Sequence, residues 1–531
     1  MTTPPSTAKR VARQARLRLW RTQRRAERIR HGLLPQQIGP RDQVERFDYW
    51  RYRDGLLGDV SAAFARAGVD HVLIPDRTLP QPLVIIRRQD ATRARAALAE
   101  DLRTARCYLA QYVNSVAAAA LPAAWPQPLL PQTTGLLVTR NLVTPRDVPL
   151  IHPDWGVLVD LWDELADAPV PPLGNPPPDS LVSRMPNGIV GHLAPQVWRQ
   201  AQANGHQLPD RPPHLLEVNE PVDLVYTWVN GMDPAWQSRK AQHLGAGLSD
   251  RAHSIDAAIA ARFENRDELR YSLRSVEMFA NWVRHIWIVT DNQVPSWLRT
   301  DHPRLTVVDH RDIFRDQSAL PSFNSHAIES QLHHIDGLSN LWLYLNDDML
   351  FGCPVRPEKF FHGNGLVKFF PSTAQVEPRE PSIHDVTVTA AAKNNRKFLE
   401  AHHGRTITNK LRHTAYPQSV KLSARFESEY PELFDEVMRA RFRQRTDHAI
   451  CSSLSQYYGF IHGLTVPGRV RNGYVDLAHP LAAHVLEMWL RRHDYDTLCI
   501  NDSGAGTATM DAELRDFFTS YFPLPSEWER D

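Results

Sequence analysis

The chain has 531 residues, which is too many for a single hydrophobic core and predicts two or three domains. Hydrophobic residues make up 42% and charged residues 23%, as in ordinary globular proteins, so the composition argues against a disordered chain. The formal net charge is +1, from 61 Lys+Arg and 60 Asp+Glu, and gives no general attraction for nucleic acid.

Four cysteines occur, at positions 107, 353, 451 and 499, and none forms a CxxC pair. This spacing predicts neither a zinc site nor a disulfide framework, and it favours a reducing, cytoplasmic setting. No apolar stretch approaches the roughly 20 residues of a membrane span, and the Arg-rich N-terminus lacks the apolar segment of a secretory signal.

Residues 1–40 are interpreted as a basic N-terminal segment, with one helix over 8–31 that carries many arginines and few apolar positions. Two interpretations of this helix remain open. It is either a solvated basic arm or a peripheral attachment to the anionic inner face of the cell membrane.

Residues 41–215 are predicted to be a smaller accessory α/β region. Its elements are expected to be a helix over 49–67, strands over 71–75 and 82–86, and a second helix over 91–113. Residues 120–215 are rich in proline, which breaks regular elements, so we expect mostly linker and irregular structure there. No catalytic constellation stands out in this region, and its role stays open.

Residues 216–531 alternate between strand-like and helix-like segments, which predicts an α/β catalytic domain with a Rossmann-like, mainly parallel sheet. Strands are expected over 223–229, 283–289, 305–308 and 341–345, and polar residues follow each of them. In open α/β sheets, ligands bind at the carboxyl ends of the strands. The repeated pattern therefore indicates a site built along that edge.

Asn346, Asp347 and Asp348 directly follow the apolar strand 341–345. Two adjacent carboxylates repel each other unless they share a cation or a proton. On these residues alone, two interpretations are open: a solvated turn, or a site where a hard divalent cation holds phosphate oxygens.

Four ordered blocks between residues 221 and 529 carry a resemblance to a known family. They include Asp-Leu-Val-Tyr-Thr-Trp-Val-Asn-Gly-Met-Asp-Pro at 223–234, the stretch from 262 to Asn-Asp-Asp at 346–348, the stretch from 413 to 447, and Cys-Ile-Asn-Asp at 499–502. The chain resembles the Stealth proteins, a group of sugar-phosphate transferases. They include bacterial capsule polysaccharide phosphotransferases and the lysosomal N-acetylglucosamine-1-phosphotransferase α/β precursor.

The resemblance implies a glycosyltransferase-like fold and a phosphotransferase reaction in capsule or exopolysaccharide synthesis. A sugar 1-phosphate would pass from a nucleotide-sugar, UDP-linked hexose or N-acetylhexosamine, to a glycan hydroxyl, with release of a nucleoside monophosphate. Two alternatives stay open. One is a metal-dependent glycosyltransferase that releases a nucleoside diphosphate, and the other is a non-catalytic glycan- or nucleotide-binding module.

The candidate site residues fall into three groups. The catalytic candidates are Asn346, Asp347, Asp348 and His413, with either Asp347 or His413 as the general base. The candidates for binding the donor or its phosphates are Asp233, Arg270, Arg274, Asn324, His326, Glu329 and Arg443. The candidates for holding Mg²⁺ or Mn²⁺ are Asp348, Asn501 and Asp502. Structural roles remain open for several of them, as helix caps, turns or a solvated basic stripe.

Overall fold

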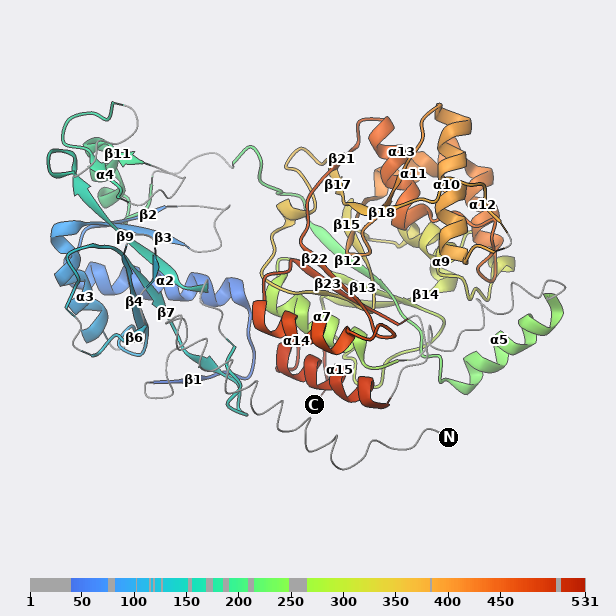
Figure 1. Ribbon diagram of the computed structural model, residues 1–531, viewed down its shortest axis with the longest axis horizontal. Helices are drawn as coiled ribbons and strands as arrows, with labels where there is room; N and C mark the ends of the chain where they lie inside the picture. The colour runs from blue at the N-terminus through green and yellow to red at the C-terminus, as the bar shows by residue number, and fades with distance from the viewer. Residues whose placement is uncertain are drawn as a thin grey trace. The chain divides into compact units, whose positions relative to one another are not determined.

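The computed structural model describes residues 40–530 apart from 75–81, 102, 114–115, 118–119, 126–127, 151–154, 169–174, 185–190, 209–213, 248–264, 383 and 503–507. The helix predicted over 8–31 lies outside the described residues. The chain separates into two compact units, Met1–Pro212 and Pro213–Asp531 (Figure 1). Among the helices of the described residues, none has both the length and the apolarity needed to cross a membrane.

The first unit is built on a sheet of nine described strands. Its main path runs β11-β10-β9-β7-β4-β5, with β3 parallel to β9, β2 antiparallel to β3, and β6 antiparallel to β4. The strands are β2 (His71–Ile74), β3 (Leu83–Arg87), β4 (Tyr108–Val113), β5 (Val116–Ala117), β6 (Leu121–Pro122), β7 (Thr133–Thr139), β9 (Val157–Glu164), β10 (Leu181–Val182) and β11 (His192–Leu193). A separate pair joins β1 (Asp42–Gln43) to β8 (Leu142–Val143).

Strand β9 shows how this sheet buries both of its faces. Val159 and Leu161 belong to a core shared with helices α2 (Tyr49–Arg66) and α3 (Ala91–Glu100). The next residue, Trp162, packs in a second core with Trp198 of helix α4 (Pro195–Ala203). Successive strand residues point to opposite faces, so one strand supplies both cores.

Two expectations for this unit were wrong. The second helix ends at Glu100 rather than continuing to Val113, because Tyr108–Val113 is rich in aromatic and branched residues and forms β4 instead. The Pro-rich stretch also contains β7, β9 and α4, so it is not mainly linker. Strands β7 and β9 contain no proline, and Pro195 occupies the first turn of α4, where a missing N–H costs no helix hydrogen bond.

The main sheet of the second unit has the order β14-β13-β12-β15-β20. The four strands predicted from the sequence are present, parallel and adjacent, whereas β20 is antiparallel to β15. Their bounds are β12 (Val222–Thr227), β13 (Ile286–Thr290), β14 (Leu305–Asp309), β15 (Leu341–Asn346) and β20 (Tyr416–Ser419). The expected mainly parallel α/β sheet is therefore confirmed.

The strand order places a topological switch at the centre of the sheet. After β12, the chain adds β13 and β14 on one side and then returns to add β15 on the other. Ligands in open α/β sheets bind outside the carboxyl ends of the strands at such a switch point. A ligand-binding site is therefore expected at the carboxyl ends of β12 and β15, where Thr227 pairs with Asn346.

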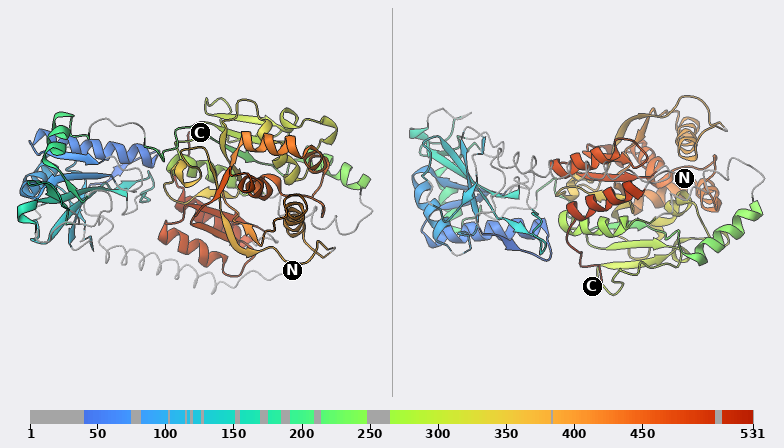
Figure 2. Two further views of the ribbon diagram at one scale, coloured as in Figure 1. Left: turned by 90° about the horizontal axis from the view of Figure 1, so that it is seen from above. Right: turned by 60° about the horizontal axis from the view of Figure 1, so that its bottom comes forward.

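Smaller sheets and helices surround the main sheet (Figures 1 and 2). The small sheets are β16 (Met349–Phe351), β23 (Thr497–Asn501) and β22 (Asn472–Asp476); β17 (Val367–Phe369) with β21 (Thr465–Pro467); and β18 (Pro371–Gln375) with β19 (Asn409–Leu411). The helices are α5 (Pro234–Gly247), α7 (Glu268–Phe279), α8 (His310–Ile313), α9 (Ser325–Gln331), α10 (Thr387–His403), α11 (Val420–Glu429), α12 (Pro431–Arg439), α13 (Ser455–Ile461), α14 (Ala482–Arg492) and α15 (Ala508–Tyr521). Helices α10 to α13 share one core, in which Phe426 and Tyr458 stack.

Candidate functional site

The Asp347-Asp348 pair occupies the turn between β15 and β16. Strand β16 is antiparallel to β23, with Met349 opposite Cys499, and the Asp348 carbonyl accepts a hydrogen bond from the amide of Ile500. This pairing brings the last family block, over 499–502, against the carboxylate turn. Two segments about 150 residues apart in sequence therefore build one edge of the site.

Ionisation of the two aspartates is unfavourable at these positions. Burial raises the pKa of both Asp347 and Asp348 to about 7, and the charge of Asp348 further raises that of Asp347. Asp348 Oδ1 is buried and has no hydrogen-bond partner in the described structure. A bound cation would both neutralise the pair and use this oxygen, so the residues fit the divalent metal that the family implies.

Glu268, at the start of α7, is a third carboxyl group at this edge that was not predicted. Burial, together with the charge of Asp347, raises the pKa of Glu268 to about 8. Its Oε2 accepts a hydrogen bond of 2.6 Å from the amide of Arg266. Its position inside the block that begins at 262 was the available signal.

His413 and Cys499 converge on Asp348. His413 Nε2 lies 3.9 Å from Asp348 Oδ2, and the Cys499 thiol lies 3.5 Å from the same oxygen. The other ring nitrogen of His413, Nδ1, lies 2.8 Å from the hydroxyl of Tyr416. Burial lowers the pKa of His413 to about 4, so its ring is neutral at pH 7 and has one lone pair available.

The ligand atoms of Asp348, His413 and Cys499 all lie within 4.8 Å of one another. This group differs from the predicted metal ligands, because it contains a histidine and a thiol in place of Asn501 and Asp502. A nitrogen and a sulfur suit a softer ion better than Mg²⁺ or Mn²⁺, which prefer oxygen. The sequence pattern predicted no role for Cys499 beyond its place as the first residue of the last family block.

Asn346 and Glu329 belong to one buried network. The Tyr344 hydroxyl lies 2.5 Å from Asn346 Oδ1 and 3.3 Å from Glu329 Oε1, so its single proton serves one acceptor at a time. Thr227 Oγ1, at the end of β12, lies 3.1 Å from the same hydroxyl. Glu329 Oε2 is buried and has no hydrogen-bond partner in the described structure, as is the case for Asp348 Oδ1.

Asn324 and His326 lie at the start of α9 and are tied to the third block. Asn324 caps the helix by accepting from the His326 amide, and its Nδ2 donates a 2.8 Å bond to Asp447 Oδ2. His326 Nδ1 lies 3.4 Å from the same oxygen. Arg443 donates to Ser325 Oγ at 2.6 Å. These contacts join two family blocks, while phosphate binding by these residues stays a prediction.

Asn501, Asp502 and Asp233 each have protein partners. Asp502 forms a 2.9 Å ion pair with Arg266, and Asn501 Nδ2 donates to Asp476 at 3.2 Å. Asp233 accepts from Gln293 Nε2 and from the amide of Ala235, both at 2.9 Å, at the start of α5. Metal or donor binding by these three side chains stays a prediction, and Arg266 is a cation at this edge that was not predicted.

Arg270 and Arg274 lie on one face of α7, as their spacing predicted, and both pair with Glu529. Arg274 Nε lies 2.7 Å from Glu529 Oε1, its second terminal nitrogen lies 2.8 Å from Oε2, and Arg270 pairs with the same carboxylate. Glu529 is only 5% exposed and also accepts from the Ser526 amide at 2.7 Å. This arrangement fastens the C-terminal segment onto α7.

Replacing Arg274 with alanine is therefore expected to destabilise the fold, by about 1–3 kcal/mol, because Glu529 loses charge-assisted hydrogen bonds in a buried place. Urea unfolding followed by circular dichroism measures this. Arg492→Ala, which removes an exposed pair with Asp494, is the matched control and should leave the unfolding midpoint unchanged. A raised donor KM in Arg274→Ala with unchanged stability would instead assign Arg274 to phosphate binding.

The fold and the site together define a Rossmann-like α/β protein with a carboxylate-lined site at its topological switch point. Four conserved regions of the Stealth proteins match the chain: region 1 at 220–246, region 2 at 262–369, region 3 at 412–460 and region 4 at 488–531. The chain belongs to the Stealth family.

Several relatives are named exopolysaccharide phosphotransferases. SCO6023 of Streptomyces coelicolor is 48% identical over 317 residues, covering 59% of this chain and 53% of that protein. CpsY of Mycobacterium leprae is 38% identical over 327 residues, covering 60% and 58%. SCO2594 of Streptomyces coelicolor is 34% identical over 512 residues, covering 90% and 84%. The chain thus spans little more than half the length of the first two and most of the third.

Among solved structures, the galactosyltransferase LgtC in complex with donor and acceptor sugar analogs aligns with 58% of this chain and 98% of its own. The identity is 12% and the TM-score is 0.30. At that level, the alignment adds nothing to the fold described above.

Proposed function

We propose that this chain is a phosphotransferase that moves a sugar 1-phosphate from a nucleotide-sugar to a glycan hydroxyl during exopolysaccharide synthesis. The observation that carries the proposal is the carboxylate turn at the switch point, where Asp348 approaches His413 and where Asp348 Oδ1 has no hydrogen-bond partner among the described residues. The relatives' names support the phosphotransferase class. The donor would be UDP-linked, and the product would be a phosphodiester.

The side chains at this site could supply each of the groups that phosphoryl transfer requires. Phosphoryl transfer needs a positioned acceptor hydroxyl, a proton acceptor and stabilisation of the diphosphate charge. Neutral His413 offers a lone pair for the hydroxyl proton, and Tyr416 holds its ring in place. Asp347 is the alternative base. Asp348, with Asp347, would hold a Mg²⁺ or Mn²⁺ ion, which when bound would neutralise charge on the diphosphate.

The released nucleotide tests the reaction class. Purified protein would be incubated with a panel of nucleotide-sugars and a bacterial glycan acceptor, with and without Mg²⁺ or Mn²⁺, and the nucleotide identified by mass. We expect a nucleoside monophosphate, formed only with a divalent cation. Release of a diphosphate would make the chain a glycosyltransferase that attacks the anomeric carbon. Binding of donor without release under every condition would favour a binding module.

A further inference from the structure

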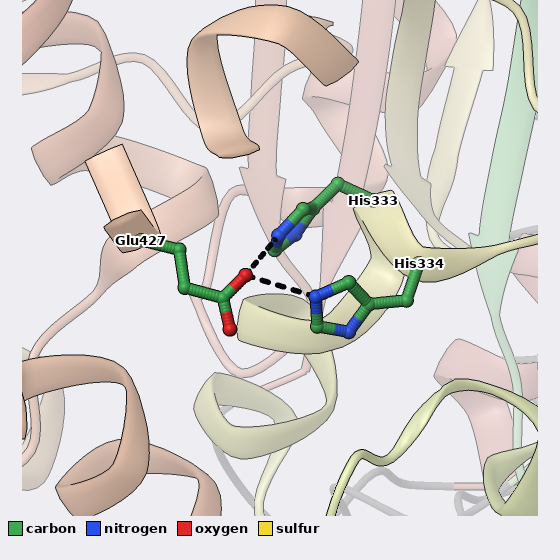
Figure 3. A group of neighbouring side chains, drawn as sticks. All are labelled: His333, His334 and Glu427. Atoms are coloured by element: carbon green, nitrogen blue, oxygen red, sulfur yellow. Dashed lines mark hydrogen bonds and ion pairs between the residues drawn. The ribbon is translucent and has the colours of Figure 1, made fainter. Parts of the chain in front are cut away.

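A second group of ligating side chains lies away from the carboxylate turn. His333 and His334, in the 3₁₀ turn η6 (Leu332–His334) after α9, both point at Glu427 of α11 (Figure 3). Their Nε2 atoms lie 2.7 Å and 2.9 Å from the same carboxylate oxygen, Glu427 Oε2. All three side chains are nearly buried, with 4%, 13% and 9% exposed.

The hydrogen bonding of His334 defines its protonation. Its Nδ1 lies 3.1 Å from the carbonyl oxygen of Ile313, which can only accept, so Nδ1 carries a proton. In a neutral ring, Nε2 then has a lone pair, which would face the carboxylate of Glu427 at 2.9 Å and be repelled by it. Either the ring carries a second proton or a cation lies between the two groups.

The surroundings have the form of a metal site. A histidine ligand commonly donates its other ring proton to a backbone carbonyl, as His334 does, and a carboxylate ligand is itself held by a hydrogen-bond donor. Glu427 has such a donor in Arg315, whose guanidinium lies 3.2 Å from Oε1. Zinc bonds of about 2 Å would separate ligand atoms by about 3.3 Å. The two histidine–Glu427 distances are 2.7 Å and 2.9 Å, and all three ligand atoms lie within 4.8 Å of one another, so small side-chain shifts would be needed to admit the ion.

A cavity reaches the Glu427 side of this group. Its volume is about 540 Å³, and its lining includes Glu427, Arg315 and Gln331. Gln331 is 1% exposed, and its Oε1 has no hydrogen-bond partner in the described structure. The cavity thus lies beside one of the three proposed ligands and beside a polar acceptor that has no hydrogen-bond partner in the described structure, and neither histidine lines it.

We propose that His333, His334 and Glu427 bind one divalent transition metal of the zinc type. Two imidazole nitrogens and one carboxylate oxygen suit zinc, whereas magnesium and calcium prefer oxygen ligands throughout. The ion would clamp η6, which precedes β15, to α11, which follows β20. Since β15 leads to Asp348 and β20 carries Tyr416, the clamp would stabilise the edge on which the candidate site stands. This inference does not depend on the proposed function.

The test is metal binding by the full chain. Protein stripped with a chelator is equilibrated with micromolar free Zn²⁺, and bound metal is measured by mass spectrometry. Cys499→Ser, made in every sample, removes the thiol of the Asp348 group and weakens zinc binding there, and zinc that still binds at that group is recognised because Glu427→Gln does not affect it. In this background we expect one zinc per chain, and Glu427→Gln should weaken zinc affinity by at least about 10-fold. His484→Ala, which removes a histidine side chain that is 70% exposed, should leave the affinity unchanged.

Co²⁺ provides an independent readout. Bound at this group in the Cys499→Ser background, it should give a visible spectrum without a thiolate band, and His334→Asn should remove that spectrum. Circular dichroism confirms that each variant is folded. Absence of zinc from the folded Cys499→Ser protein, or equal affinity in Glu427→Gln, would overturn the proposal and leave an ion pair between Glu427 and a doubly protonated His334.

Discussion

Replacing Asp348 with asparagine is expected to lower nucleotide release from the donor by about a thousandfold. The substitution keeps the size of the side chain but removes the charge that would hold a cation at the end of β15. It also puts an NH₂ group in place of one carboxylate oxygen. That oxygen is either Oδ1, which has no hydrogen-bond partner within the described part of the chain, or Oδ2, which Cys499 and His413 approach. Steady-state kinetics with the donor found in the nucleotide panel, at saturating Mn²⁺, measures the loss.

Asp301→Asn is the control, because that carboxylate is 81% exposed and makes a single long ion-pair contact, of 3.7 Å, with Arg299. It should retain full activity. Donor affinity, measured separately by calorimetry, distinguishes a catalytic role from a binding role. Unchanged turnover in folded Asp348→Asn would remove the carboxylate turn from the mechanism and favour a site elsewhere on the sheet.

The second large effect is expected on stability, from Asp223→Asn in β12. Asp223 is fully buried and accepts hydrogen bonds from Arg284 at 2.8 Å and 2.5 Å, from Trp287 Nε1 at 3.0 Å and from the Ser339 amide at 2.9 Å. It thereby ties β12 to β13 and to the segment before β15. Removing its charge should cost about 2–3 kcal/mol, because the hydrogen bonds to a buried carboxylate are weakened, while the remaining Arg284 is 46% exposed and stays solvated. Urea unfolding measures the change.

The same carboxylate predicts a pH dependence. Burial alone would raise the pKa of Asp223, but the hydrogen bonds from Arg284, Trp287 and Ser339 outweigh it and hold the pKa below its ordinary value. A lowered folded-state pKa contributes stability above the unfolded pKa, and this contribution is lost as pH falls. The difference between wild type and Asp223→Asn should therefore be constant from pH 6 to 8 and shrink below about pH 4. A difference that stays constant through the acid range would contradict this account.

The strands of the catalytic unit were predictable because their signal is local. Short apolar runs that end in polar residues indicate strands buried on both faces, and each of the four parallel strands was placed within three residues at either end. Strand β4 was taken for helix because its first residues continue the Ala- and Leu-rich pattern of α3. There the tertiary pairing with β7 decided the outcome.

The sequence by itself determined the family, the parallel sheet and the place of Asn346, Asp347 and Asp348 at a strand end, because motif order and periodicity are properties of neighbouring residues. Only the tertiary structure decided which groups meet there. Cys499 reaches Asp348, Arg266 pairs with Asp502, and Arg274 holds Glu529 across 255 residues. Such pairings depend on how distant segments pack, and a local sequence pattern does not indicate which partner a charged side chain will contact.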